Sequence, residues 1–316
     1  FITARDLSEG VLEGFAAGGV DYVIKPFQDR EVLARVETHL RLHRLTGELA
    51  RRNEELEAEI AQRRKLKGRL SQISEREAER WGLPGFIGRS PTIQEIFRTI
   101  RLMQDSPATS VLITGENGTG KELIARAIHF GSERREGAFI PVNCAALPAD
   151  LAESLLFGHV RGAFTGADED RVGHFEAAHE GSLFLDEIAD MAPALQAKLL
   201  RVLEDGEVWR VGARQGQTVD VRVLAATNAD LQQRIDDSCF RQDLFFRLAH
   251  FTVVAPPLRE RRDDIPLLAE HFLGHFAVEM GREPPTLSVA ALEALTSYEY
   301  PGNVRELRNI VERALI

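Results

Sequence analysis

The sequence predicts an α/β fold with a mostly parallel five-stranded sheet, followed by a smaller helical subdomain. Apolar runs that end in polar residues alternate with helical patterns, which is typical of parallel strands buried on both faces. The runs are VLIT at 111–114, AFIPVN at 138–143, SLFLDE at 182–187, VRVLAATN at 221–228 and FTVVAPP at 251–257. From residue 259 onward only helical patterns follow, and Asn303 with Glu306 after the Pro301-Gly302 turn predicts a capping box at the start of the last helix. Ser90 followed by Pro91 predicts the start of an earlier helix. Because ligands of such sheets bind at the carboxyl ends of the strands, we expect the functional site where the polar residues fall.

Length and composition favour a globular protein of about two domains. The 316 residues are 44% hydrophobic and carry a net charge of −10, which argues against a surface devoted mostly to nucleic acid. No stretch approaches the ~18 apolar residues of a membrane span and no leader opens the chain, so we expect a cytoplasmic protein without membrane association. Cys144 and Cys239 lie far apart without metal-type spacing, which favours reduced thiols. Phe1 is not an initiator and Ile316 ends a helical pattern without a cap, so we expect a longer parent protein.

The first 80 residues differ in pattern from the rest of the chain. Residues 1–40 alternate helical and strand patterns around VDYVIKPF. Residues 42–73 carry a heptad repeat with Arg52, Glu59 and Arg63 in its middle, which predicts a weak coiled coil that pairs two subunits and passes a signal. A solvated single helix is the alternative. WGLPG at 81–85 breaks the pattern. The expected domains are therefore 1–40, 41–80, 81–258 and 259–316.

The strand at 111–114 runs into a glycine-rich turn and then a helical pattern. Gly115 and Gly120-Lys121 have the spacing of a phosphate-binding P-loop, in which glycines let successive N–H groups point at the phosphates. Lys121 then lies at a helix N-terminus, where the dipole adds to its charge. A simple turn is the alternative, and the flanking strand and helix disfavour it. Glu122 replaces the usual Ser or Thr, so a metal must be held elsewhere.

An acidic pair and an asparagine follow two other predicted strands. Asp186 can hold Mg²⁺ and Glu187 can orient or deprotonate water, as phosphoanhydride hydrolysis requires. Combined with a P-loop, this pair predicts binding of ATP or GTP. Asn228 could orient the same water or could simply form a turn.

Several motifs, in this order, resemble the AAA+ domain of bacterial enhancer-binding proteins, the activators of sigma-54 RNA polymerase. They are GENGTGKE at 115–122, GAFTGA at 162–167, LFLDE at 183–187, ATN at 226–228, FRQDLFFRL at 240–248 and PGNVREL at 301–307. The resemblance spans about residues 86–316, and GAFTGA is its most specific part. Residues 1–40 resemble the last third of a response-regulator receiver domain, with Thr3 at the switch position and Lys25-Pro26 at the strand end. An unrelated connector is the alternative there, and no phosphoacceptor aspartate is present.

This resemblance implies a role for each matching residue. Lys121 binds phosphates, Asp186 binds the metal, Glu187 polarises water and Asn143 restrains Glu187. Asn228 is the first sensor residue, and Arg305 is the second sensor residue, on the lid. The implied nucleotide-binding residues are Ile87, Gly115, Glu116, Asn117, Gly118, Thr119, Gly120, Lys121, Glu122 and Arg305. ATP and Mg²⁺ are the implied cofactors.

Arg241 and Arg247 match arginines that act on the nucleotide of a neighbouring subunit. A guanidinium suits the charge that spreads over a leaving phosphoryl group, which supports this role on physical grounds. Surface ion pairs are the alternative. The cluster of Arg259, Arg261 and Arg262 favours lid or intersubunit contacts over nucleic-acid binding.

The loop of Gly162, Ala163, Phe164, Thr165, Gly166 and Ala167 matches the tip that contacts sigma-54. Without the resemblance it is a glycine-flanked turn whose Phe164 could pack inward. Val160 stands where relatives usually carry an acidic residue, which puts the coupling of the loop to the nucleotide in question.

The resemblance therefore implies a ring-forming ATPase, hexameric or heptameric, that remodels the sigma-54 RNA polymerase holoenzyme in a two-component signalling context. Enhancer DNA would be bound only through a C-terminal domain absent here. The alternatives are an AAA+ remodeller of a different protein and a scaffold that binds nucleotide without hydrolysis. GAFTGA disfavours the first, and the acidic pair with the arginines disfavours the second.

Overall fold

A computed structural model describes residues 2–3, 15–18, 20–21, 23–26, 28–49, 51–52, 86–106 and 109–316. The chain divides into two compact units, residues 1–69 and 70–316. In the first unit β1 (Ile2–Thr3) pairs in parallel with β2 (Val23–Ile24), and residues 29–49 are helical. The resemblance of residues 1–40 to a receiver domain stays a prediction.

Of the predicted heptad, only its beginning falls within the described residues. Leu42, Leu45 and Leu49 are exposed on the helix at 29–49. The remaining heptad positions and the WGLPG segment lie outside the described residues. The coiled coil and the boundaries of the four domains therefore stay predictions.

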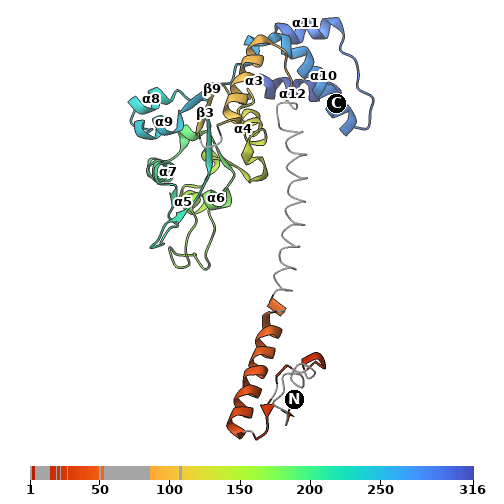
Figure 1. Cartoon of the computed structure of the whole chain (residues 1–316). Helices are drawn as coiled ribbons and strands as arrows, with labels where there is room; N and C mark the ends of the chain where they lie inside the picture. The colour runs from red at the N-terminus through yellow and green to blue at the C-terminus, as the bar shows by residue number, and fades with distance from the viewer. Residues whose placement is uncertain are drawn as a thin grey trace. The chain divides into compact units, whose positions relative to one another are not determined.

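The second unit is built on five parallel strands, which confirms the predicted sheet (Figure 1). They are β3 (Val111–Thr114), β4 (Phe139–Asn143), β5 (Ser182–Asp186), β8 (Arg222–Thr227) and β9 (Phe251–Val254). Their spatial order is β4-β5-β8-β3-β9, so the P-loop strand β3 lies between β8 and β9. The carboxyl ends of β3, β5 and β8 thus lie at one edge of the sheet.

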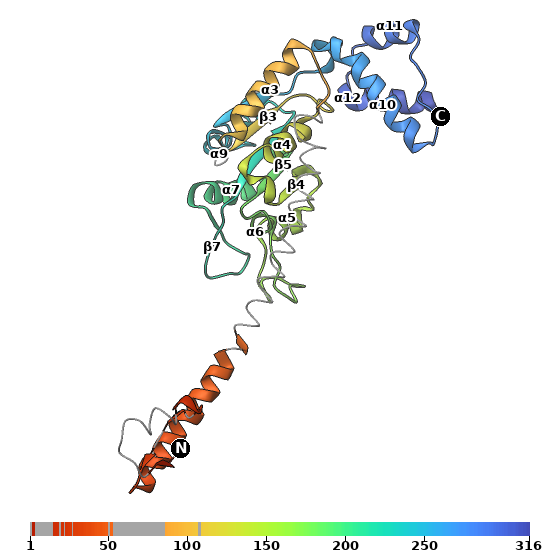
Figure 2. The ribbon, with the colours of Figure 1, turned by 45° about the vertical axis from the view of Figure 1, so that its right-hand side comes forward.

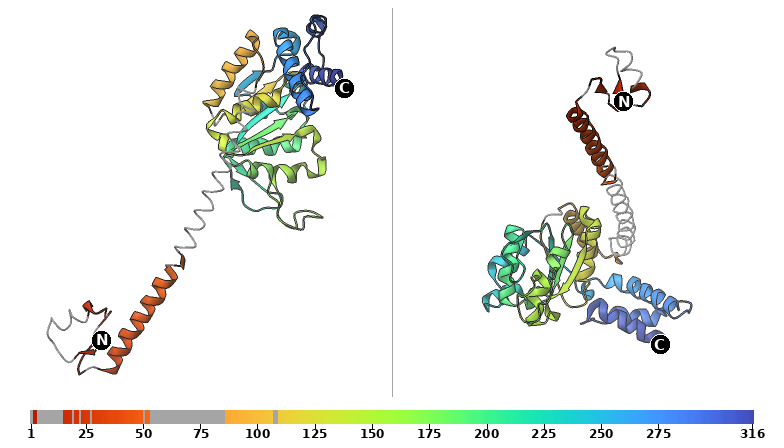
Figure 3. Two further views of the ribbon diagram at one scale, coloured as in Figure 1. Left: turned by 90° about the vertical axis from the view of Figure 1, so that its right-hand side faces the viewer. Right: turned by 90° about the horizontal axis from the view of Figure 1, so that it is seen from below.

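Helices cover both faces of this sheet, as its uniformly apolar strands require (Figure 3). On one face, α3 (Pro91–Gln104) and α4 (Lys121–Phe130) pack with Ile113 and Leu224. The other face packs with Leu112 and Val223 in a second core. Its helices are α5 (Ala149–Phe157), α6 (His174–Ala177), α7 (Pro193–Asp205), α8 (Leu231–Asp236) and α9 (Gln242–Leu248). Ser90 caps α3 by accepting a hydrogen bond from the Ile93 N–H, as the Ser-Pro pattern predicts.

The lid consists of helices with their own core. They are η5 (Leu258–Glu260), η6 (Arg262–Asp264), α10 (Ile265–Glu279), α11 (Val289–Ser297) and α12 (Asn303–Leu315). Within the described residues, no helix is both long and apolar enough to span a lipid bilayer.

The capping box predicted at the start of α12 forms only in part, and the predicted N-cap residue, Asn303, is wrong. Glu306 does fold back, and its Oε2 accepts a hydrogen bond from the Gly302 N–H at 2.8 Å. The N-cap residue, however, is Gly302, because Asn303 has a φ of 51° and its side chain points out of the helix toward other partners.

The loops after α5 and α7 lie at the end of the second unit opposite the lid (Figure 2). One of them includes the short antiparallel pair β6 (Glu207–Val208) and β7 (Gln217–Thr218). The other, 158–173, contains GAFTGA, and His159 at its base bridges to Arg171 and to Val211.

Candidate functional site

The P-loop joins the carboxyl end of β3 to the N-terminus of α4. Gly115, Gly118 and Gly120 all have positive φ values, of 149°, 77° and 102°. A Cβ atom on Gly115 would lie 2.6 Å from the Ala255 carbonyl oxygen, so this turn requires glycine on steric grounds as well. The first turn of α4 thus opens directly from the loop, with Lys121 as its first residue.

Lys121 lies almost fully buried beneath this loop. Its ammonium donates hydrogen bonds to the carbonyl oxygens of Gly115 at 2.9 Å and Glu116 at 3.3 Å. Burial lowers the pKa of Lys121, and the carboxylates of Glu187 and Asp186 act in the opposite direction. An ammonium group fixed by the carbonyl oxygens of a glycine-rich loop is well placed to bind an anionic phosphate.

The acidic pair follows β5 and faces the same edge of the sheet. Glu187 has a φ of 50°, and this left-handed conformation turns its side chain toward the P-loop. Its Oε1 lies 4.0 Å from the Lys121 Nζ, and its Oε2 accepts a hydrogen bond of 3.3 Å from the Asn228 backbone N–H. Three strand ends therefore meet at Glu187.

Asp186 is a half-buried carboxylate with few partners. Its Oδ1 accepts a hydrogen bond from the Glu187 N–H at 3.1 Å, and burial raises its pKa. A cation would relieve this penalty, so the residue fits a magnesium ligand. In the described part of the chain no cluster of three or more His, Cys, Asp or Glu side chains could hold a metal alone. Mg²⁺ takes one or two protein carboxylates and completes its shell with phosphates and water, so Asp186 could serve as its protein ligand.

Glu122, which replaces the usual hydroxyl residue, is turned away along the helix. Its carboxylate pairs with Arg126 one turn later, at 2.7 Å. The Arg126 guanidinium lies 4.8 Å from the centre of the Phe139 ring. Glu122 therefore stands on the surface of α4 beside the site, where its charge adds to the rise in the pKa of Asp186.

Every P-loop residue from 116 to 119 contacts the lid, an arrangement that the sequence reasoning missed. The Glu116 carboxylate accepts two hydrogen bonds from the Arg259 guanidinium, at 2.6 and 2.8 Å. Asn303 Nδ2 donates to Glu116 Oε2 at 3.1 Å and to the Asn117 carbonyl oxygen at 3.0 Å. The Val304 N–H donates to the Gly118 carbonyl oxygen at 3.0 Å, and Arg261 donates to the Thr119 carbonyl oxygen at 2.9 Å. The lid thus holds the phosphate-binding loop directly.

The predicted residues outside the P-loop lie at varying distances from it. Arg305 is on the first turn of α12, and a Cβ on Gly118 would lie 3.1 Å from its Cβ. Ile87 packs against the lid core. Asn143 stands beside Asp186 in register but caps η3 (Cys144–Ala146), because its Oδ1 accepts hydrogen bonds from the Ala145 and Ala146 N–H groups. Within the described ranges no hydrogen bond joins Asn143 to Glu187, so its restraining role stays a prediction.

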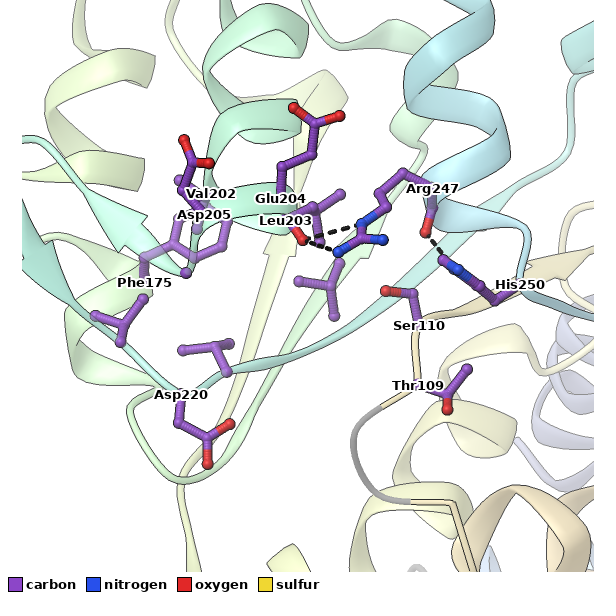
Figure 4. Close-up of a pocket in the computed structure, with 14 residues that line it drawn as sticks. Thr109, Ser110, Phe175, Val202, Leu203, Glu204, Asp205, Asp220, Arg247 and His250 are labelled. Carbon is purple, nitrogen blue, oxygen red and sulfur yellow. Dashed lines mark hydrogen bonds between the residues drawn. The ribbon is translucent and has the colours of Figure 1, made fainter.

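Arg241 precedes the first residue of α9, and Arg247 lies in its last turn. Arg241 pairs with Asp243 at 2.7 Å, and Arg247 donates two hydrogen bonds to the Leu203 carbonyl oxygen. Arg247 lines a cavity of about 430 Å³, with Thr109 and Ser110 among its other walls (Figure 4). These two residues precede β3, so the cavity lies at the amino end of that strand, whereas the P-loop follows its carboxyl end.

Backbone hydrogen bonds close the GAFTGA loop on itself, and Ala163 lies close to Gly212 of the neighbouring loop. The Gly162 N–H donates to the Ala167 carbonyl oxygen at 2.8 Å, and the Arg161 N–H donates to Asp170 at 2.7 Å. Phe164 is 39% exposed and makes an edge contact with the His159 ring, with centroids 5.0 Å apart. Thr165 is exposed, and Ala167 is buried. Phe164 therefore packs in part against His159 and leaves the rest of its ring exposed, and Thr165 presents its hydroxyl to solvent.

Comparisons with known proteins agree with this arrangement. Residues 86–254 match the Sigma-54 interaction domain, and residues 259–316 match the AAA+ ATPase lid domain. The regulatory protein AtoC of Escherichia coli is 44% identical over 315 residues, which cover this whole chain and 64% of AtoC. The Nif-specific regulatory protein of Azotobacter vinelandii is 51% identical over 230 residues, 73% of this chain and 44% of that protein. The chain spans less than two thirds of the length of each of these relatives.

Solved structures show the same relationship. NtrX from Brucella abortus, crystallised in complex with ADP, superposes with a TM-score of 0.68 at 33% identity and covers 99% of this chain and 62% of NtrX. A second crystal structure of NtrX is a complex with ATP. The 20% identical Hsp104 shares the fold, with a TM-score of 0.51. By the match of more than half of its length to the family model and by these relatives, the chain belongs to the sigma-54 interaction domain family of AAA+ proteins.

Proposed function

We propose that this chain is the ATP-hydrolysing motor of a sigma-54-dependent transcriptional regulator and remodels the sigma-54 RNA polymerase closed complex. The convergence of Lys121, Glu187 and Asn228 at one edge of the sheet carries this proposal. A buried cation, a carboxylate and a strand-end amide are the groups that phosphoanhydride hydrolysis uses. The ATP and ADP complexes of NtrX support the same substrate.

In this mechanism Lys121 and the P-loop N–H groups bind the β- and γ-phosphates. Glu187 accepts a proton from the attacking water, the water oxygen bonds to the γ-phosphorus, and the bond to the β–γ bridging oxygen breaks to leave ADP. Asn228 helps to orient the water, and Asn143 restrains Glu187 until the γ-phosphate is in place. Asp186 would hold Mg²⁺, which neutralises phosphate charge when bound. Arg305 reaches the nucleotide from the lid.

The rate of ATP hydrolysis tests the proposed enzymatic activity. The purified chain is expected to hydrolyse ATP at a rate per subunit that rises with protein concentration, because complete sites form only in the assembled ring. Glu187→Gln is expected to keep ATP binding and to lower kcat by about 10²- to 10⁴-fold, the usual contribution of a general base. Unchanged turnover in Glu187→Gln would remove that residue from the mechanism.

Arg241 and Arg247 would complete the site of a neighbouring subunit. Arg247 lies by the amino end of β3, so it is poorly placed for its own P-loop at the other end. Mixing two variants tests this. Lys121→Ala and Arg247→Ala should each be inactive alone, yet an equal mixture should recover about one quarter of the wild-type rate, because random assembly completes one interface in four. No recovery on mixing would place Arg247 in its own site or in structure alone.

The exposed GAFTGA loop is the part that would contact sigma-54. Phe164 and Thr165 stand at its tip, and His159 at the base of the loop forms a hydrogen bond with Ser154 of α5. We further propose a hexameric or heptameric ring, a cytoplasmic location, and enhancer DNA binding through a domain outside this chain.

A further inference from the structure

Glu116 is a carboxylate in a loop that is built to receive an anion. Its backbone carbonyl lies 3.3 Å from the Lys121 Nζ, and its neighbours Gly115 and Gly118 shape the turn. A negative charge at this position would repel a bound polyphosphate. The Glu116 side chain is 44% exposed, so nothing in its burial keeps it protonated.

The lid supplies the counter-charge. Arg259, on η5, donates one hydrogen bond from each terminal nitrogen to the Glu116 carboxylate, and the Asn303 amide donates a third. These partners, Arg259 first, lower the pKa of Glu116 to about 2, so the carboxylate is ionised at neutral pH. Both side chains of the ion pair are more than one third exposed, and exposed pairs contribute little to folding stability. The pair therefore calls for a role other than holding the fold.

We propose that Arg259 sets nucleotide affinity by neutralising Glu116, so that the lid acts as the counter-ion of the P-loop. While Arg259 is paired with Glu116, the net charge of the two side chains beside the bound phosphates is zero. A lid displacement that separates the two side chains leaves the Glu116 carboxylate uncompensated beside the phosphates and promotes nucleotide release. This inference rests on the proposed nucleotide-binding function and names two positioning residues for it.

The charge mechanism makes a prediction that a purely structural role does not make. If Arg259 only tied the loop to the lid, Arg259→Gln and Glu116→Gln would both weaken binding, and the double variant would be no better than either. If Arg259 neutralises a harmful charge, removing that charge must rescue the loss of Arg259.

The experiment measures the dissociation constant for ADP by calorimetry with the whole chain at low and high salt. Arg259→Gln should weaken binding about tenfold in 0.05 M salt and about threefold in 0.5 M salt, because salt screens the exposed carboxylate. Glu116→Gln should bind ADP more tightly than wild type, because the Arg259 charge is then no longer neutralised. The double variant Glu116→Gln with Arg259→Gln should return to within about threefold of wild type, and Arg259→Lys should do so because it keeps the charge.

Arg210→Gln is the matched control. The Arg210 guanidinium also donates two hydrogen bonds to one glutamate, Glu176 of α6, outside the lid and the P-loop, so its loss should leave ADP affinity unchanged. Equal melting temperatures across the series would exclude unfolding as the cause of weak binding. A double variant as weak as Arg259→Gln, or a loss independent of salt, would overturn the inference. A wild-type chain that binds no ADP would instead overturn the proposed function.

Discussion

The P-loop and the GAFTGA loop are both short, glycine-rich and strained in φ, yet their surroundings are opposite. A Cβ on Gly118 would lie 2.3 Å from the Gly302 carbonyl oxygen, and one on Gly115 would meet Ala255 at 2.6 Å. Around Gly162 and Gly166, by contrast, no atom of the described residues lies within 4 Å of the added Cβ. The first loop is enclosed by the lid and by the segment after β9, and the second projects into solvent.

The space around the glycines shows that glycine has a different role in each loop. In the P-loop it permits both a backbone conformation and a close approach of the lid, so the two pack directly against each other. In the GAFTGA loop it permits only the backbone conformation and leaves the tip free to meet a partner. The same residue type therefore marks a preorganised site in one place and an accessible surface in the other.

Gly118→Ala should lower folding stability more than any other substitution considered for the two loops. The added methyl meets both a clash with the Gly302 carbonyl and an unfavourable φ of 77°. We expect a loss of about 3–5 kcal/mol in the free energy of unfolding, from overpacking and left-handed strain together, and a loss of ADP binding. Urea unfolding and calorimetry measure both. A near-normal variant would mean that the lid does not rest on this glycine in solution.

His129, in the last turn of the helix that begins at Lys121, should make folding stability sensitive to acid. The ring is fully buried, its Nδ1 lies 2.9 Å from the Ser182 hydroxyl, and burial lowers its pKa to about 4. Between pH 6.5 and about 4 the unfolded chain binds a proton that the folded chain does not. Stability should thus fall as the pH drops through this window, by about 3 kcal/mol in all.

The variant His129→Gln isolates this contribution. The difference in unfolding free energy between wild type and variant should change with pH across that window and stay constant above pH 7.5. A difference that is the same at pH 7 and pH 4.5 would contradict the buried neutral histidine.

Gly166→Ala should have the smallest effect on stability. Its φ of 97° disfavours alanine, but no neighbour crowds the new methyl, so the exposed loop can adjust. We expect a loss of about 1 kcal/mol or less in unfolding free energy and retention of ADP binding. A loss comparable to that of Gly118→Ala would show that the loop packs against something in solution, and the contrast between the two loops would disappear.

The sequence predicted those features that local patterns determine. The five strands, the P-loop turn and the position of Asp186 and Glu187 at a strand end all follow from short stretches of chain, and the structure confirms this fold. The Ser90-Pro91 start of α3 is correct for the same reason, since a cap depends on neighbours three residues away.

The contacts between the lid and the P-loop could not be predicted in this way. Arg259 and Glu116 are 143 positions apart, and no periodicity connects them. Asn303 looked like a helix cap because it follows a Pro-Gly turn, but its side chain accepts from the Leu258 N–H at 2.7 Å and donates to the P-loop. For Arg259, Arg261 and Arg262 the sequence left lid and intersubunit contacts open. In the structure Arg259 and Arg261 contact the P-loop and Arg262 contacts Glu299, partners that depend on tertiary packing.

The most direct measurement is capture of purified sigma-54 by this chain with ADP and a metal fluoride, which imitates the transferring phosphoryl group, compared with ADP alone. The account predicts a stable complex only with the analogue, and its loss in Thr165→Ala, whose exposed hydroxyl lies at the loop tip. Thr165→Ala should still hydrolyse ATP, because the loop lies outside the nucleotide site. Hydrolysis by wild type without any capture would contradict the central claim and indicate a motor that remodels a different protein.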